Sequence, residues 1–128
     1  MANGKNQSIK ITSIQCHGTN DTGGFNDEVY IIYQSDAGLP IRFPLFGSQN
    51  MNTSADSGSN TVQQWNVDLV LDFDQEVLVT LWDSDEGTAK RSDFLINCDY
   101  DSGNPPASFH MQNNNGADYT INAEAYSE

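Results

Sequence analysis

Apolar and polar residues alternate with a period of two along most of the chain, which is typical of β-strands with one buried and one solvated face. In segment 67–74 the apolar residues occupy one parity, and three aspartates and a valine occupy the other. The segments 77–82 and 29–33 are apolar on both parities and rich in β-branched residues. This composition predicts two central strands. No helical stripe of ten residues occurs.

The first expected strand contains a change of parity. Ile9 and Ile11 share one face of a regular strand, whereas Ile14 and Cys16 share the other. A β-bulge inserts one extra residue and so returns the later side chains to the first face. The sequence therefore predicts a bulge near Ser13.

The remaining segments complete an all-β pattern. Segment 41–45 alternates as well, with Pro40 directly before it and Pro44 within it. These prolines favour an edge strand, because proline cannot donate a hydrogen bond to a sheet. Weaker strand candidates are 94–98, 107–111 and 119–125, and 47–61 is expected to be a long polar loop. About eight short strands separated by Gly, Asn, Asp and Ser clusters predict a single antiparallel β-sandwich domain over residues 1–128.

Composition narrows the classes of function. The chain carries 18 Asp and Glu against 5 Lys and Arg, a formal net charge of −13. Such a surface repels nucleic acid and anionic membranes, which bind through Lys and Arg, and attracts cations. No apolar run is long enough to span a bilayer. No secretory signal is visible, so the protein is expected to be cytoplasmic, already processed, or exported without a classical signal. Nothing pairs a nucleophile with a base, so no enzyme is expected.

Two cysteines, Cys16 and Cys98, are too few for a disulfide framework. A single bridge between them stays open, but the sequence favours two buried thiols. The two histidines, His17 and His110, stand alone in the sequence, and neither has the spacing of a zinc site. His17 is expected to be a surface or capping residue.

Acidic residues gather in two predicted loops. The first loop spans 20–28, and the second spans 83–87 and is followed by Asp93 before another apolar segment. Close carboxylates repel one another unless a cation neutralises them, and calcium takes six to eight oxygen ligands in a flexible geometry. A third acidic stretch, 99–103, lacks the glycine and terminal glutamate of an EF-hand loop and is expected to be a solvated turn.

Both loops carry a family pattern. Asp-Thr-Gly-Gly-Phe-Asn-Asp over 21–27, followed by a tyrosine-centred apolar strand, resembles the first calcium loop of the C2 domain, a calcium-dependent lipid-binding family. Leu-Trp-Asp-Ser-Asp over 81–85, then Asp-Phe-Leu-Ile over 93–96, resembles its third loop and the following strand. The lysine-rich strand with which many members bind acidic phosphoinositides is absent, so that activity is not carried over.

The resemblance implies an eight-stranded C2-like sandwich with calcium bound by loops at one end. Asp21 and Asp27 would be ligands from the first loop, Asp83 and Asp85 from the third, and Asp93 would close the site.

The calcium ions would leave coordination positions open for a phospholipid headgroup. Phe25, between Gly24 and Asn26, would be an exposed apolar wedge for lipid or a protein partner. Two alternatives stay open. Calcium could only stabilise a structural domain with a protein-interaction role, or the open positions could take sugar hydroxyls in a lectin or adhesion module.

Overall fold

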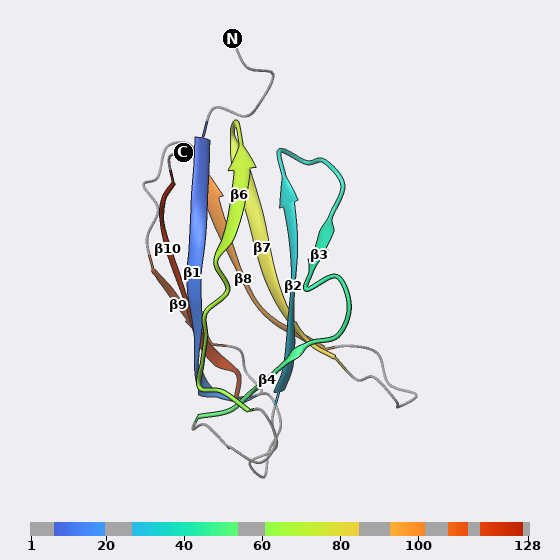
Figure 1. The fold of residues 1–128 in the computed structure, drawn as a ribbon, viewed down its shortest axis with the longest axis vertical. Helices are drawn as coiled ribbons and strands as arrows, with labels where there is room; N and C mark the ends of the chain where they lie inside the picture. The colour runs from blue at the N-terminus through green and yellow to red at the C-terminus, as the bar shows by residue number, and fades with distance from the viewer. Residues whose placement is uncertain are drawn as a thin grey trace.

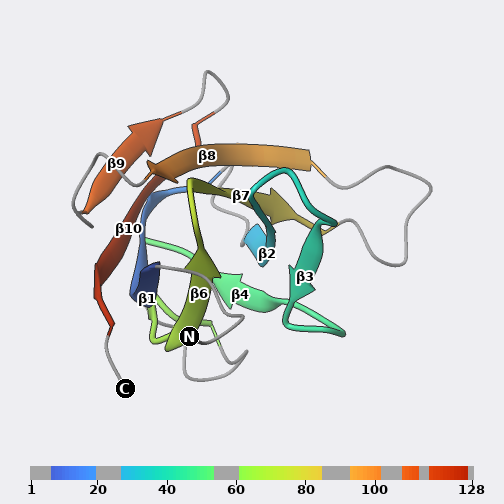
Figure 2. The ribbon, with the colours of Figure 1, turned by 90° about the horizontal axis from the view of Figure 1, so that it is seen from above.

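The chain forms two antiparallel sheets packed face to face (Figures 1 and 2). The structure is a computed structural model that describes residues 7–19, 27–53, 61–84, 93–101, 108–112 and 116–126, with the backbone alone at 93–98 and 101. No helix in these segments is long and apolar enough to cross a membrane. The strands are β1 (Gln7–Gly18), β2 (Asp27–Ser35), β3 (Ile41–Phe43), β4 (Gln49–Met51), β5 (Gln64–Trp65), β6 (Leu69–Phe73), β7 (Glu76–Asp83), β8 (Asp93–Asp101), β9 (Phe109–Gln112) and β10 (Asp118–Ala125).

Each sheet has one interrupted edge. The first sheet has the order β5-β1-β10-β9, and β6 also pairs with β1, so β5 and β6 lie along different parts of the same strand. The second sheet has the order β3-β2-β7-β8, and β4 also pairs with β2. The described residues form ten strands where the sequence predicted about eight, and the short strands β4 and β5 are the two that it did not predict. The central places of β2 and β7 and the edge place of β3 are confirmed.

The predicted bulge in the first strand is confirmed. Ile11 pairs with Ala123 of β10 and Ser13 pairs with Asn122, so Thr12 is the extra residue. The hydroxyl of Thr12 donates a hydrogen bond to the carbonyl oxygen of Asn122 at 3.2 Å. The bulge explains how apolar side chains of opposite parity in β1 all enter the core.

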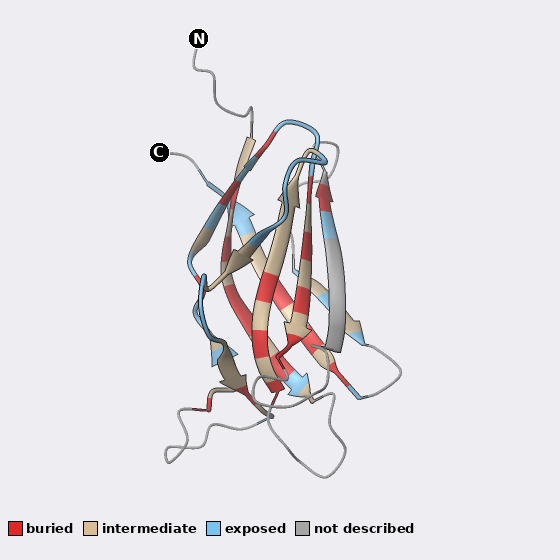
Figure 3. Ribbon diagram, turned by 90° about the vertical axis from the view of Figure 1, so that its right-hand side faces the viewer, coloured by how far each residue is buried: buried red, intermediate tan, exposed pale blue. Residues whose placement is uncertain are grey.

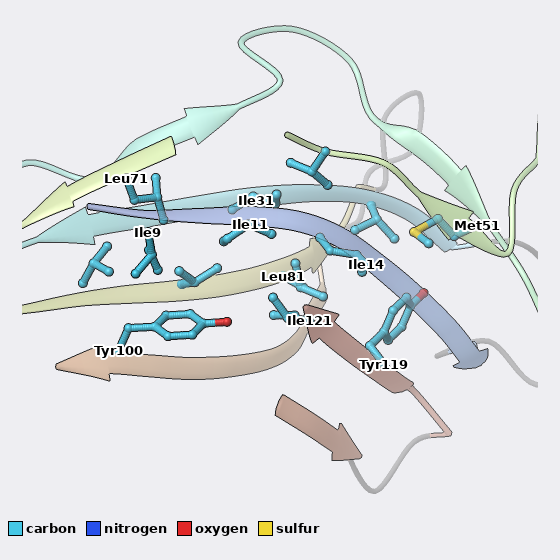
Figure 4. Close-up of a cluster of buried hydrophobic side chains, with 14 of the residues drawn as sticks. Ile9, Ile11, Ile14, Ile31, Met51, Leu71, Leu81, Tyr100, Tyr119 and Ile121 are labelled. Carbon is cyan, nitrogen blue, oxygen red and sulfur yellow. The ribbon is translucent and has the colours of Figure 1, made fainter. Parts of the chain in front are cut away.

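The core fills the space between the two sheets, where buried and partly exposed residues alternate along the strands (Figure 3). Figure 4 shows side chains from both sheets in one cluster, including the rings of Tyr100 and Tyr119. The buried hydrophobic residues are Ile9, Ile11, Ile14, Cys16, Val29, Ile31, Met51, Val67, Leu71, Phe73, Val77, Val79, Leu81, Tyr100, Ala117, Tyr119 and Ile121.

The prediction of a turn over 99–103 is wrong for residues 99–101, which belong to strand β8. Strand β8 continues through Asp101, and Tyr100 pairs with Val77 of the neighbouring strand β7. Tyr100 is only 2% exposed. Burial of this ring decides the conformation against the turn preference of its acidic neighbours, because a buried aromatic ring removes a large apolar area from water.

The loop expected at 47–61 also contains a strand. Within it, β4 pairs with the beginning of β2, and Met51 is completely buried. The edge strand β3 is shorter than the alternation predicted, since it ends at Phe43 and Leu45 is 70% exposed. Proline at position 44 has no N–H to continue the ladder.

Candidate metal site

Three of the predicted calcium ligands lie at strand ends that the sheet register brings together. Asp27 begins β2, Asp83 ends β7 and Asp93 begins β8. In the register, Asp83 is opposite Val29 on one side and opposite Asp93 on the other. These strand ends lie at the lower end of the second sheet in Figure 1. Segments far apart in the sequence therefore supply aspartates to one end of the sandwich.

The side chain of Asp83 is buried and held by the backbone of β2. It is 3% exposed, and its Oδ1 accepts a hydrogen bond from the N–H of Glu28 at 2.7 Å. The next residue, Ser84, donates its N–H to the carbonyl oxygen of Glu28, also at 2.7 Å. A buried carboxylate is costly unless donors compensate it, and here the start of β2 supplies one. The side chain of Asp83 is thus oriented toward the beginning of β2.

Asp27 connects the two sheets. It is fully buried, and its Oδ2 accepts a hydrogen bond from the hydroxyl of Tyr119 at 2.5 Å. Tyr119 belongs to β10 of the first sheet, and Figure 4 shows its ring in the buried cluster near Ile14. Hydrogen bonds to ionised groups are stronger than neutral ones. The contact therefore fixes the acidic end of one sheet to the interior of the other.

Two titratable groups with raised pKa values, the Cys16 thiol and the Tyr119 hydroxyl, lie beside Asp27. Burial raises the pKa of the Cys16 thiol to about 11, and the negative charges of Asp27 and Asp118 act in the same direction. Hydrogen bonds with the Tyr119 side chain and the Gly18 backbone act in the opposite direction. Burial, and then the charge of Asp27, raise the pKa of the Tyr119 hydroxyl far above its usual range. Cys16 is a free and buried thiol, as the sequence predicted for it. Both groups stay protonated in the folded protein at neutral pH.

Stability is expected to fall as the pH rises above about 9. The Cys16 pKa is raised from 9.0 to about 11 on folding, so the folded state holds this proton more tightly than the unfolded chain. The resulting stabilisation is complete below pH 9 and is lost between 9 and 11, and the raised pKa of Tyr119 has the same sign at higher pH. Urea unfolding from pH 7 to 11 measures this, and Cys16→Ala should flatten the decline between pH 9 and 11. Tyr126→Phe is the control, and a profile in which Cys16→Ala falls as steeply as the wild type would contradict the expectation.

Several predicted site residues fall outside these observations. Asp21, Asp85 and Phe25 lie outside the described residues, and at Asp93 only the backbone is described. Within the part of the chain that the structure describes, no three or more His, Cys, Asp or Glu side chains are grouped to hold a metal ion. The described part of the candidate site therefore consists of the two buried aspartates, Asp27 and Asp83, and the backbone position of Asp93.

Tyr119 belongs to this site, although no motif in the sequence points to it. It begins the segment 119–125, which was a weaker strand candidate, and it is completely buried. No local signal points to its hydroxyl partner, since Asp27 is 92 positions away. Only the packing of the two sheets brings the pair together.

A separate surface feature lies along the β3 edge of the second sheet. Four large apolar side chains are exposed there, and we call them the apolar edge patch: Leu39, Ile41, Leu45 and Phe46. Leu39 and Phe46 are each 85% exposed. Segment 37–55 contains no Asp or Glu and a single basic residue, Arg42. The patch thus lies in a segment without acidic residues on a strongly acidic protein.

Comparisons with known proteins add a weak structural likeness. No protein-family model matches the chain, and no curated protein matches it. Human GIVD cytosolic phospholipase A2, solved in complex with methyl gamma-linolenyl fluorophosphonate inhibitor and terbium chloride, matches 94% of this chain at 12% identity with a TM-score of 0.48. A second structure of human GIVD cytosolic phospholipase A2 matches 99% of the chain at 12% identity with a TM-score of 0.49. The chain spans 17% of the length of each of these proteins.

Proposed function

We propose that this chain is a calcium-binding recognition module of C2-like type, without enzymatic activity. The observation that carries the proposal is the register that brings Asp27, Asp83 and Asp93 to one end of the second sheet. Asp21 precedes Asp27 by six positions, and Asp85 follows Asp83 by two, so both are within reach of the same end by chain connectivity. Five aspartates with few nearby cations favour a hard divalent ion with oxygen ligands.

The burial of Asp83 supports this assignment. A carboxylate that is 3% exposed and accepts a backbone N–H is already oriented, so its binding of an ion requires little further ordering. An ion beside Asp27 and Asp83 would neutralise charges that repel one another in its absence. Calcium is therefore expected to stabilise the fold and to order this end of the sandwich.

The recognition step follows from the charge of the whole chain. With a net charge of −13 the protein is repelled by anionic lipid, and bound calcium reverses the sign of the potential at one end only. Open coordination positions on the ion would then accept phosphate oxygens of a phospholipid headgroup. Phe25, in the first acidic loop, would add insertion of an aromatic ring.

Liposome sedimentation tests the lipid step. We expect the chain to sediment with phosphatidylserine-containing vesicles in calcium and to stay in the supernatant in chelator. Phe25→Ser should weaken sedimentation several-fold, whereas Leu39→Ser should not, because the exposed Leu39 follows the end of β2 that is opposite to Asp27. Equal sedimentation with and without calcium would contradict the proposed lipid binding. It would not contradict calcium binding, which the calorimetric titration tests separately.

A second candidate function is a structural calcium site in a domain with a protein-interaction role. The observation that favours it is the contact between Asp27 and Tyr119, since an ion at Asp27 would stabilise both sheets at once. On this alternative, calcium raises the melting temperature by mass action but no vesicle binding appears. Thermal unfolding and sedimentation of the same sample, each in calcium and in chelator, distinguish the two functions.

A further inference from the structure

The two histidines of the sequence meet on the outer surface of the first sheet. His17 lies near the end of β1 and His110 lies in β9, and β10 runs between these strands (Figure 2). The ring centroids are 5.4 Å apart, with the ring planes at 81°. Both side chains are accessible to solvent, since His17 is exposed and the side chain of His110 is 57% exposed. The fold thus joins two residues that looked isolated in the sequence.

Both rings are oriented through the same atom, Nε2. His110 Nε2 is 2.5 Å from Asp118 Oδ1, and Gln112 donates a hydrogen bond to the other oxygen of Asp118 at 2.9 Å. His17 Nε2 is 2.9 Å from the hydroxyl oxygen of Thr120. A carboxylate that accepts one ring N–H fixes the tautomer and leaves the lone pair on the other nitrogen. Among the residues described, neither Nδ1 has a hydrogen-bond partner.

The separation of the rings suits a shared metal ion. Two imidazoles that bind one ion through nitrogens about 2.1 Å away place their ring centroids roughly 5 Å apart. An open recess of about 250 Å³ is lined by Gln112, Gly116, Ala117 and Asp118, the last of which also contacts His110. The carboxylate of Asp118 and the net charge of −13 both favour a cation there.

We propose that His17 and His110 bind a divalent transition-metal ion such as Cu²⁺, Ni²⁺ or Zn²⁺ through two ring nitrogens, with water in the remaining positions. Asp118 acts as a positioning residue, because it orients His110 without binding the ion. Imidazole nitrogen suits these ions, whereas calcium requires oxygen ligands. The site shares no residue with the proposed calcium site and does not depend on it.

Metal titration of the chelator-treated whole chain tests this proposal. We expect saturable binding of one Cu²⁺, with weaker binding of Ni²⁺ and Zn²⁺ and no competition from millimolar calcium. The electron paramagnetic resonance spectrum of the Cu²⁺ complex should show splitting from two nitrogens. Binding should weaken as the pH falls, since protons compete with the metal for imidazole.

Variants separate this site from binding to surface carboxylates. His17→Ala and His110→Ala should each weaken Cu²⁺ binding on the order of tenfold or more and remove one nitrogen from the spectrum, and Asp118→Asn should weaken it about tenfold with both nitrogens retained. Gln64→Ala, an exposed change on the same sheet, is the matched control. Near-ultraviolet circular dichroism confirms that each variant is folded. Absence of binding by the wild type, or binding unchanged in both histidine variants, would overturn the proposal.

Discussion

Replacing Asp83 with asparagine is expected to remove most of the heat of calcium binding in titration calorimetry of the whole chain. Asp83→Asn keeps an oxygen that can accept the N–H of Glu28, so the link between β7 and β2 stays intact. It removes one negative charge from the ligand set, and the affinity of an oxygen site for calcium depends on the number of charged ligands. The variant therefore separates the charge of this residue from its structural role.

The same variant should affect thermal unfolding only when calcium is present. At a free calcium concentration of 100 times the dissociation constant, the wild type gains about 2.7 kcal/mol of stability by mass action, and Asp83→Asn should gain little. In chelator the variant should melt at or above the wild-type temperature, because one repelling carboxylate is gone.

Asp99→Asn is the matched control for this experiment. It makes the same charge change on an exposed residue of β8, which pairs with Leu78 away from the acidic end. A calcium heat that is equal in Asp83→Asn and the wild type would contradict the site. So would a wild type that melts identically in chelator and in millimolar calcium.

Replacing Tyr119 with phenylalanine is expected to lower the free energy of unfolding by about 1.5–3 kcal/mol, the usual value of a hydrogen bond to a charged group. Tyr119→Phe keeps the ring in the core but removes the hydroxyl that donates to Asp27. Asp27 is completely buried, so water cannot easily replace the lost donor. Urea unfolding at pH 7 in chelator measures the difference without any contribution from calcium.

A double-mutant cycle assigns this effect to the contact itself. Tyr119→Phe, Asp27→Ala and the double variant should give a coupling free energy of about 1 kcal/mol or more, because the two groups share one bond. Tyr126→Phe removes a hydroxyl from a tyrosine just beyond the same strand that is 36% exposed, and it should cost little. Equal costs for Tyr119→Phe and Tyr126→Phe would contradict the structural role of the contact.

Local patterns predicted much of the fold because they depend on neighbouring residues only. The alternation in 67–74 predicted a strand with one buried face, and Leu71 and Phe73 are each 1% exposed. The parity change between Ile11 and Ile14 predicted the bulge at the correct place. The same reasoning was wrong at 99–103, since turn preference was weighed without knowledge that Tyr100 packs between the sheets.

The candidate site could be predicted only in part. The spacing of aspartates at strand ends drew attention to Asp27 and Asp83, and the register brings their strand ends together. That Asp27 is buried against Tyr119, and that His17 meets His110, had no signal in the sequence. Each of these contacts joins two strands that lie far apart in the sequence.

The sequence by itself determined the strand faces, the parity of the first strand and the surplus of negative charge, because side-chain direction and charge are properties of a residue and its immediate neighbours. The tertiary structure decided which strand ends meet and which polar groups pair inside the sandwich. Those pairings depend on the order of the strands and on the packing of the two sheets over a common core. The strength of each buried contact depends on the exclusion of water that this packing produces.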